Sequence, residues 1–253
     1  MYTDGALGSR GAALLEPYSD RPDSKGLMLQ DQTALQTLVD QASREGFQAN
    51  MHAIGDRANR IALDIYAQNL KNDDQSQKLR HRIEHAQVVD VSDIPRFSEL
   101  GVIPSMQPTH ATSDKNMAGD RLGQERLAGA YAWRFFLDSG SRIAAGSDFP
   151  VEPANPFYGI HAAVTRKDRQ DQPEGGWRLG QKLTAAEALR GFTIDAAYAA
   201  HQEDSLGGLM PGQWADFLLV DTDIMRTAPE NIWQTQVEQT WIAGEAVYER
   251  EQD

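Results

Sequence analysis

Three short apolar runs in the sequence each end at a residue that can bind a metal, and each is followed by a loop. These residues are His52 after the run 47–51, His85 after 79–84 and Asp148 after 142–147. Metal-binding side chains at the carboxyl ends of successive strands are how a β/α barrel builds its active site. Two imidazoles and a carboxylate can hold a divalent metal and activate a water. The order of these residues therefore predicts a metal site at the end of a parallel sheet.

The composition limits the ligands and partners that the chain can have. Thirty-seven acidic and 24 basic residues give the 253-residue chain a net charge of −13, which argues against nucleic acid or an anionic membrane as a partner. Solubility is the simplest explanation of this charge. The chain has no cysteine, so disulfides and thiolate sites are excluded and any metal must bind His, Asp or Glu. No apolar run approaches the roughly 18 residues of a membrane span.

Hydrophobic periodicity predicts an α/β part followed by a small β subdomain. The expected segments are a loop over 1–30, helices over 30–45, 56–70, from 91 and over 124–138, and strands that end at 52, 85, 108 and 146. Strands that alternate with helices are typical of a parallel sheet. A capping box from Thr184 to Glu187 predicts a helix that reaches about His201. Short strands are then expected over 215–221 and twice within 237–248.

Each candidate residue also has a plainer interpretation. His52 and His85 can be structural hydrogen-bond partners, and Asp148 can be a helix cap or turn residue rather than a metal ligand and general base. His110 follows the strand between those of His85 and Asp148, so we expect it to contact substrate or polarise an oxyanion, the alternative being a plain loop histidine. His81 shares a strand face with His85 by alternation and is interpreted as structural.

The remaining histidines and one tryptophan carry weaker signals. His161 and His201 fall within predicted helices and are interpreted as structural. Trp177 lies on a glycine-rich excursion after Asp148, where it either lines a pocket or is a surface aromatic residue.

With these residues in place, the chain resembles the amidohydrolase superfamily, in particular the branch that includes the N-substituted formamide deformylases. The segments that carry the resemblance are 4–14, 52–56, 81–86, 107–110, 146–151 and 208–216, with Val247 and Tyr248 near the end. They cover essentially the whole chain, and the set is specific although no single segment is.

The resemblance implies an α/β fold, namely a partial TIM-type (β/α) barrel of about the last four or five β/α units with a small C-terminal β subdomain. Residues 1–205 are expected to be the C-terminal part of a metal-dependent hydrolase barrel, and residues 206–253 the C-terminal share of a β-sandwich. His52 and His85 match the histidines of the fifth and sixth barrel strands. Asp148 matches the eighth-strand aspartate, which is both a metal ligand and the general base.

The activity implied is hydrolysis of a carbon–nitrogen bond in a non-peptide amide or formamide by metal-activated water. One or two divalent metals are expected in the complete enzyme, with zinc as the expected ion. His110 is expected to steady the oxyanion, and Arg82, Gln107 and Trp177 to bind a small amide-type substrate. A deaminase or cyclic amidase of the same superfamily differs only in substrate.

The chain departs from the family pattern at its beginning. Family members carry a His-x-His pair on the first strand and often a carboxylated lysine on the fourth, but this chain has no His-x-His, and the lysine position falls just ahead of Met1. We therefore expect an incomplete chain whose open barrel edges are covered by a missing N-terminal half or by a homodimer. A weakened or empty metal site and little activity are expected of the chain alone. The alternative function is a non-catalytic barrel remnant that acts as a binding or regulatory module. Localisation is left open, with the cytoplasm as the default, because the first residues carry no signal core.

Overall fold

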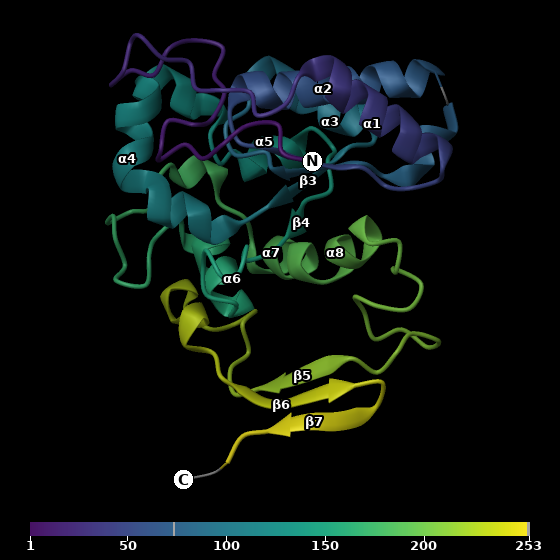
Figure 1. Cartoon of the computed structure of the whole chain (residues 1–253). Helices are drawn as coiled ribbons and strands as arrows, with labels where there is room; N and C mark the ends of the chain where they lie inside the picture. The colour runs from purple at the N-terminus through teal and green to yellow at the C-terminus, as the bar shows by residue number, and fades with distance from the viewer. Residues whose placement is uncertain (73, 252–253) are drawn as a thin grey trace. The chain divides into compact units, whose positions relative to one another are not determined.

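The computed structural model describes residues 1–72 and 74–251, which form two compact units (Figure 1). The first unit contains Met1–Met106 and Ser113–Ile143, and the second contains Gln107–Thr112 and Ala144–Asp253. The domain boundary predicted at residue 205 falls inside the second unit and stays a prediction.

The first unit is built on three parallel strands with β2 in the middle. They are β1 (Asn50–Ala53), β2 (Arg82–His85) and β3 (Ile103–Met106). Met51 lies in register with Ile83, and both side chains are fully buried. Parallel neighbours need a crossover connection, which is usually helical. The helices of this unit include α1 (Gln32–Arg44), α2 (Asp56–Asn72), η1 (Asp74–Leu79), η2 (Val91–Asp93), α3 (Ile94–Leu100), η3 (Leu127–Gly129) and α5 (Trp133–Asp138). The predicted α/β arrangement with a parallel sheet is confirmed.

The first helix shows how the local sequence sets an element. The Asp31 side chain accepts hydrogen bonds from the backbone N–H groups of Thr33 and Ala34, which caps the start of α1. Leu35 and Val39 are spaced one helical turn apart, and both are fully buried. This apolar face packs α1 against α2.

The segment 108–138 folds differently from the prediction of a strand through 108 and a continuous helix over 124–138. A helix, α4 (Pro108–Arg126), begins in the second unit and continues into the first, and α5 follows after a break. The break is required at Gly129, because a Cβ there would lie 1.7 Å from the carbonyl oxygen of Val89. Tyr131 then adopts a φ of 50°, which no right-handed helix accepts. The prediction was wrong because this close approach depends on a contact distant in sequence.

The second unit contains a short strand, several helices and an antiparallel sheet. Its elements include β4 (Ala144–Ala145), α6 (Pro156–Thr165), η4 (Leu179–Gln181), α7 (Ala185–Phe192), α8 (Ile194–Ala199), β5 (Phe217–Val220), η5 (Pro229–Gln234), β6 (Val237–Ile242) and β7 (Glu245–Glu249). The sheet order is β5-β6-β7. The three short C-terminal strands predicted from the sequence are confirmed.

The capping box at the start of α7 is confirmed, but the helix that it opens is shorter than predicted. The Thr184 N–H donates to Glu187 Oε2 at 2.8 Å, and the Glu187 N–H donates to Thr184 Oγ1 at 3.2 Å. Thr193 has φ −127° and ψ −89°, outside the helical region, and it separates α7 from α8. His201 has a φ of 57° and lies in a turn, so its predicted helical position is wrong, whereas His161 lies within α6 as predicted.

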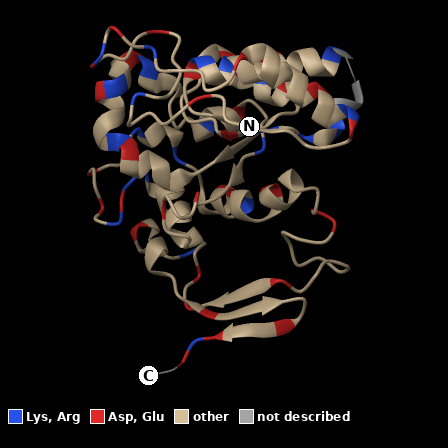
Figure 2. Cartoon of the chain, in the orientation of Figure 1, with Lys and Arg blue, Asp and Glu red and all other residues tan. Residues whose placement is uncertain are grey.

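Charged side chains are distributed differently in the two units (Figure 2). The helices and loops of the first unit carry both signs, whereas the strands β5, β6 and β7 and their loops carry mainly acidic residues. Within residues 1–72 and 74–251, no helix is both long and apolar enough to cross a membrane.

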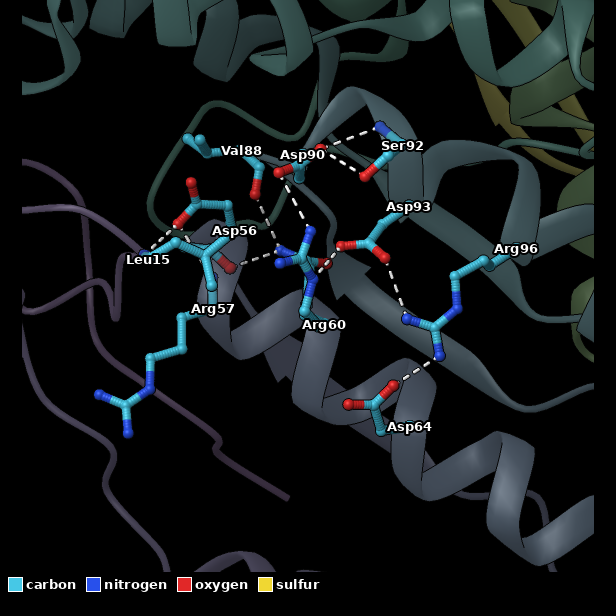
Figure 3. A network of polar contacts seen from close by, with 12 residues as sticks. Leu15, Asp56, Arg57, Arg60, Asp64, Val88, Asp90, Ser92, Asp93 and Arg96 are labelled. Atoms are coloured by element: carbon cyan, nitrogen blue, oxygen red, sulfur yellow. Dashed lines mark hydrogen bonds and ion pairs between the residues drawn. The ribbon is translucent and has the colours of Figure 1, made fainter.

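A network of charged side chains ties α2 to η2 and α3 (Figure 3). Asp93, whose side chain is 6% exposed, accepts from Arg60 Nε at 2.7 Å and from Arg96 Nη1 at 3.0 Å. Arg96 Nη2 also contacts Asp64 on α2 at 2.6 Å. The side-chain hydrogen bond with Asp93 raises the pKa of Arg60. The network therefore depends on one buried carboxylate between two guanidinium groups.

Replacement of that carboxylate is expected to be costly. Asp93→Asn should lower the free energy of unfolding by about 1–3 kcal/mol, because both guanidinium groups lose their charged partner. Asp64→Asn is the control: the Asp64 side chain is 50% exposed, and the change should stay below about 1 kcal/mol. Urea unfolding of both variants measures the difference, and equal losses would contradict the central position given to Asp93.

Candidate metal centre

His52 lies on β1 beside the first residues of the chain. Its backbone N–H donates to the Met1 carbonyl at 2.8 Å, and its own carbonyl accepts from the Thr3 N–H at 3.0 Å. Tyr2 therefore forms a parallel bridge with His52, and the two rings lie 5.2 Å apart. The His52 side chain is 16% exposed. The N-terminal segment thus covers part of the imidazole and limits its freedom.

The carboxyl group of Asp4 is fully buried beside His52. Its Oδ2 accepts hydrogen bonds from the N–H groups of Ala13 and Gly55, each at 2.8 Å, and its Oδ1 accepts from the Ile54 N–H at 3.0 Å. The same Oδ1 lies 3.4 Å from Nδ1 of His52. The sequence gave Asp4 no role, because its partners are distant in sequence. The available signal was its place at the start of the segment that carries the family resemblance.

His85 ends β2 with a left-handed backbone. Its φ is 77°, a region that residues other than glycine rarely adopt. In an extended strand, His85 would face the same side as Ala53, its partner in register. Its ring instead lies against that of His52, with the centroids 4.7 Å apart and the planes at 76°. The common face predicted for His81 and His85 is therefore wrong at His85, because the left-handed turn redirects the imidazole.

A polar cluster fixes the chain directly after this turn. Gln87 Nε2 donates to Asp114 Oδ2 at 2.9 Å and to the Tyr131 hydroxyl at 2.8 Å. The Tyr131 hydroxyl donates to the same Asp114 oxygen at 2.5 Å, and the Tyr131 N–H donates to the Gln87 carbonyl at 2.7 Å. Local periodicity did not reveal the cluster, because its members come from three different segments. It holds the turn that orients His85.

His110 and Asp148 face each other in the second unit. His110 Nε2 lies 3.2 Å from Asp148 Oδ2. His110 is in the first turn of α4 rather than in a loop, and Asp148 follows β4 with a φ of 61°. A second carboxylate, Glu152 Oε1, lies 3.7 Å from His110 Nδ1. The sequence analysis missed Glu152, although it lies four residues after Asp148 in the same turn. The two carboxylates flank the imidazole and orient it.

The three residues predicted to bind substrate have defined positions, and their role stays a prediction. Arg82, on β2, pairs with Glu84 at 2.9 Å. The Gln107 carbonyl accepts from the His110 N–H at 3.1 Å, just before α4. The half-buried Trp177 donates its N–H to the Arg166 carbonyl at 2.8 Å, and the Arg166 guanidinium lies 5.3 Å from its ring centre.

His81 is a structural histidine, as the sequence predicted. It is 4% exposed, and its ring stacks on that of Tyr66 at 4.9 Å. Its Nδ1 accepts from the Ala49 N–H at 3.0 Å, and its Nε2 lies 3.2 Å from Ser43 Oγ. Burial lowers the pKa of His81 from 6.5 to about 4. With both ring nitrogens engaged by protein groups, His81 offers no position for a metal.

Histidines at the ends of parallel strands are the arrangement of a metal-dependent α/β hydrolase. The profile of the amidohydrolase family matches residues 1–248, and the chain belongs to this family. It is 34% identical to the amidohydrolase YtcJ of Bacillus subtilis (strain 168), over 99% of this chain and 46% of that protein. It is 29% identical to the N-substituted formamide deformylase of Arthrobacter pascens, over 84% of this chain and 39% of that protein.

A solved structure is similar to the chain in fold as well as in sequence. It is a metal-dependent hydrolase from Pyrococcus horikoshii, with a TM-score of 0.78 and 30% identity over 90% of this chain and 45% of that one. The chain thus spans less than half the length of the relatives it matches.

The donor chemistry of the first unit fits a divalent metal. His52 and His85 come from neighbouring strands, and their rings are in contact. Asp4 lies next to Nδ1 of His52, which leaves Nε2 as the nitrogen that can bind a metal. In the second unit, Asp148 supplies a carboxylate oxygen that is partly exposed. Imidazole nitrogens and carboxylate oxygens are ligands that zinc accepts.

Proposed function

We propose that this chain contributes metal ligands to an enzyme that hydrolyses the carbon–nitrogen bond of a small non-peptide amide or formamide. The ligands proposed are His52, His85 and Asp148, and the proposed metal is zinc. The observation that carries the proposal is the contact between the His52 and His85 rings at 4.7 Å, obtained through a strained backbone at His85. The deformylase relative, named for N-substituted formamides, supports the substrate class.

The side chains of the two units divide the chemistry between them. A bound metal supplies Lewis-acid activation of a water for attack on the carbonyl carbon. Asp148 takes the proton of that water at its carboxylate and delivers it to the departing nitrogen. His110, which Asp148 and Glu152 hold from two sides, donates a hydrogen bond to the oxygen that gains negative charge. Contacts of Arg82, Gln107 and Trp177 with the substrate belong to the same proposal.

Zinc binding by the 253-residue chain tests the ligand assignment. Because the chain has no His-x-His pair, we expect weak binding and little hydrolysis of an N-substituted formamide. His52→Ala and His85→Ala should each weaken zinc binding by at least about tenfold, measured by competition with a chromophoric chelator. His201→Asn is the matched control, because it removes an exposed imidazole in a turn and asparagine tolerates the positive φ there.

The outcomes separate the two functions considered. Zinc binding that is unchanged in both His52→Ala and His85→Ala would contradict the metal assignment and favour a non-catalytic binding module. Clear hydrolysis by the isolated chain, abolished in Asp148→Asn, would overturn the expectation of little activity while supporting the role of Asp148.

A further inference from the structure

The surroundings of Asp4 exceed what is needed to fix a loop. Its carboxylate has no exposed surface and accepts from three backbone N–H groups, those of Ala13, Ile54 and Gly55. Two of these donors lie on Oδ2 at 2.8 Å. Oδ1 has a single backbone donor at 3.0 Å and is the oxygen directed at His52 Nδ1. Oδ1 therefore has acceptor capacity left for the imidazole.

We propose that Asp4 is a positioning residue that holds the His52 imidazole with its proton on Nδ1, so that Nε2 is the metal-binding atom. This inference rests on the proposed function, in which His52 is a ligand. An acceptor beside one ring nitrogen places the hydrogen on that nitrogen and leaves the lone pair on the other. A metal needs that lone pair, so the tautomer decides whether His52 can bind.

The ring is also confined on its other sides. Tyr2 lies 5.2 Å away with its plane tilted by 44°, and His85 lies 4.7 Å away edge-on at 76°. The backbone of His52 is fixed between the carbonyl of Met1 and the N–H of Thr3. Asp4 is thus the group that sets the proton position, while its neighbours set the plane of the ring.

Asp4→Asn tests the proposal through a change that nearly keeps the shape. The amide oxygen is expected at the Oδ2 position, where two backbone N–H groups donate, which places the NH₂ group at the Oδ1 position. There it donates to His52 Nδ1 instead of accepting from it, and the ring proton moves to Nε2. ¹⁵N NMR of histidine-labelled protein at about pH 8, where an ordinary histidine is neutral, reads the tautomer without any metal. His52→Gln assigns the signal.

We expect the Nδ1–H tautomer in the wild type, the Nε2–H tautomer in Asp4→Asn, and zinc affinity about 10- to 100-fold weaker in the variant. Asp56→Asn is the matched control. Asp56 is another buried carboxylate that accepts backbone N–H groups, from Leu15 at 2.8 Å and Arg57 at 2.9 Å. It should lower the melting temperature without moving the His52 proton or the zinc affinity relative to the wild type.

The outcomes distinguish this inference from the proposed function. An Nε2–H tautomer in the wild type overturns the inference even if Asp4→Asn fails to fold. Zinc binding that His52→Ala abolishes and Asp4→Asn leaves intact also overturns it, while the proposed function stands. A tautomer that switches in Asp4→Asn, in a chain whose zinc binding does not depend on His52, supports the positioning role and contradicts the ligand role.

Discussion

Acidification from about pH 7 to pH 4 is expected to remove about 3 kcal/mol of stability through His81 alone. Burial lowers the pKa of His81 to about 4, from 6.5. Below about pH 6.5 the unfolded chain takes up a proton on His81, whereas the folded chain does so only near pH 4. This contribution is therefore fully present above pH 6.5 and is lost as the pH falls through that window.

The physical reason is that the neutral imidazole is built into the fold. Nδ1 must be free of a proton to accept from the Ala49 N–H, and Nε2 lies between Ser43 Oγ at 3.2 Å and Asn69 Oδ1 at 3.4 Å. A charged ring would break the first of these bonds and would lie stacked on Tyr66, away from water.

Comparison with His81→Gln isolates this effect from the titration of other groups. The variant should be less stable than the wild type at neutral pH, and the difference should shrink steadily between pH 6.5 and 4.5 in urea titrations. His201→Asn, which removes an exposed imidazole, should follow the wild type over the same range. A constant difference between the wild type and His81→Gln would show that His81 does not titrate as described.

A single added methyl group at Gly55 is expected to destabilise the chain by about 3 kcal/mol. A Cβ at this position would lie 2.0 Å from the carbonyl oxygen of Ala13. That oxygen accepts from the N–H groups of Arg57 and Ala58 at 3.1 and 3.3 Å and so satisfies the start of α2. Gly55→Ala must therefore push the N-terminal loop away from the helix.

Gly180→Ala provides the matched control, because a Cβ there meets nothing within 4 Å. Its effect should stay within about 0.5 kcal/mol. Thermal and urea unfolding of the two variants measure the contrast. If Gly55→Ala were as stable as Gly180→Ala, the docking of Ala13 on α2 would not matter to the fold.

The elements that follow a local pattern could be predicted from the sequence. The strands that end near His52 and His85, the helix between them and the capping box at Thr184 depend on periodicity and on neighbouring residues. The break between α4 and α5 could not be predicted, because it depends on the contact of Gly129 with the backbone of Val89.

The site was predictable in its residue types and less so in its geometry. Position at strand ends indicated His52, His85 and Asp148. The expected role of Asp56 as a helix cap was only partly right, because its carboxylate accepts from Arg57 and also from Leu15, which joins the N-terminal loop to α2. Asp4 was missed for the same reason, since its partners are brought together only by folding.

The left-handed backbones of His85 and Asp148 have a consequence for the sequence itself. A residue with a Cβ costs roughly 1–2 kcal/mol in this conformation relative to glycine. If folding alone determined the sequence, glycine or asparagine would be favoured at both positions. The chain instead carries an imidazole and a carboxylate there. At these two points the fold is held below the stability that it could reach, so a design that maximised stability would erase the proposed ligands first.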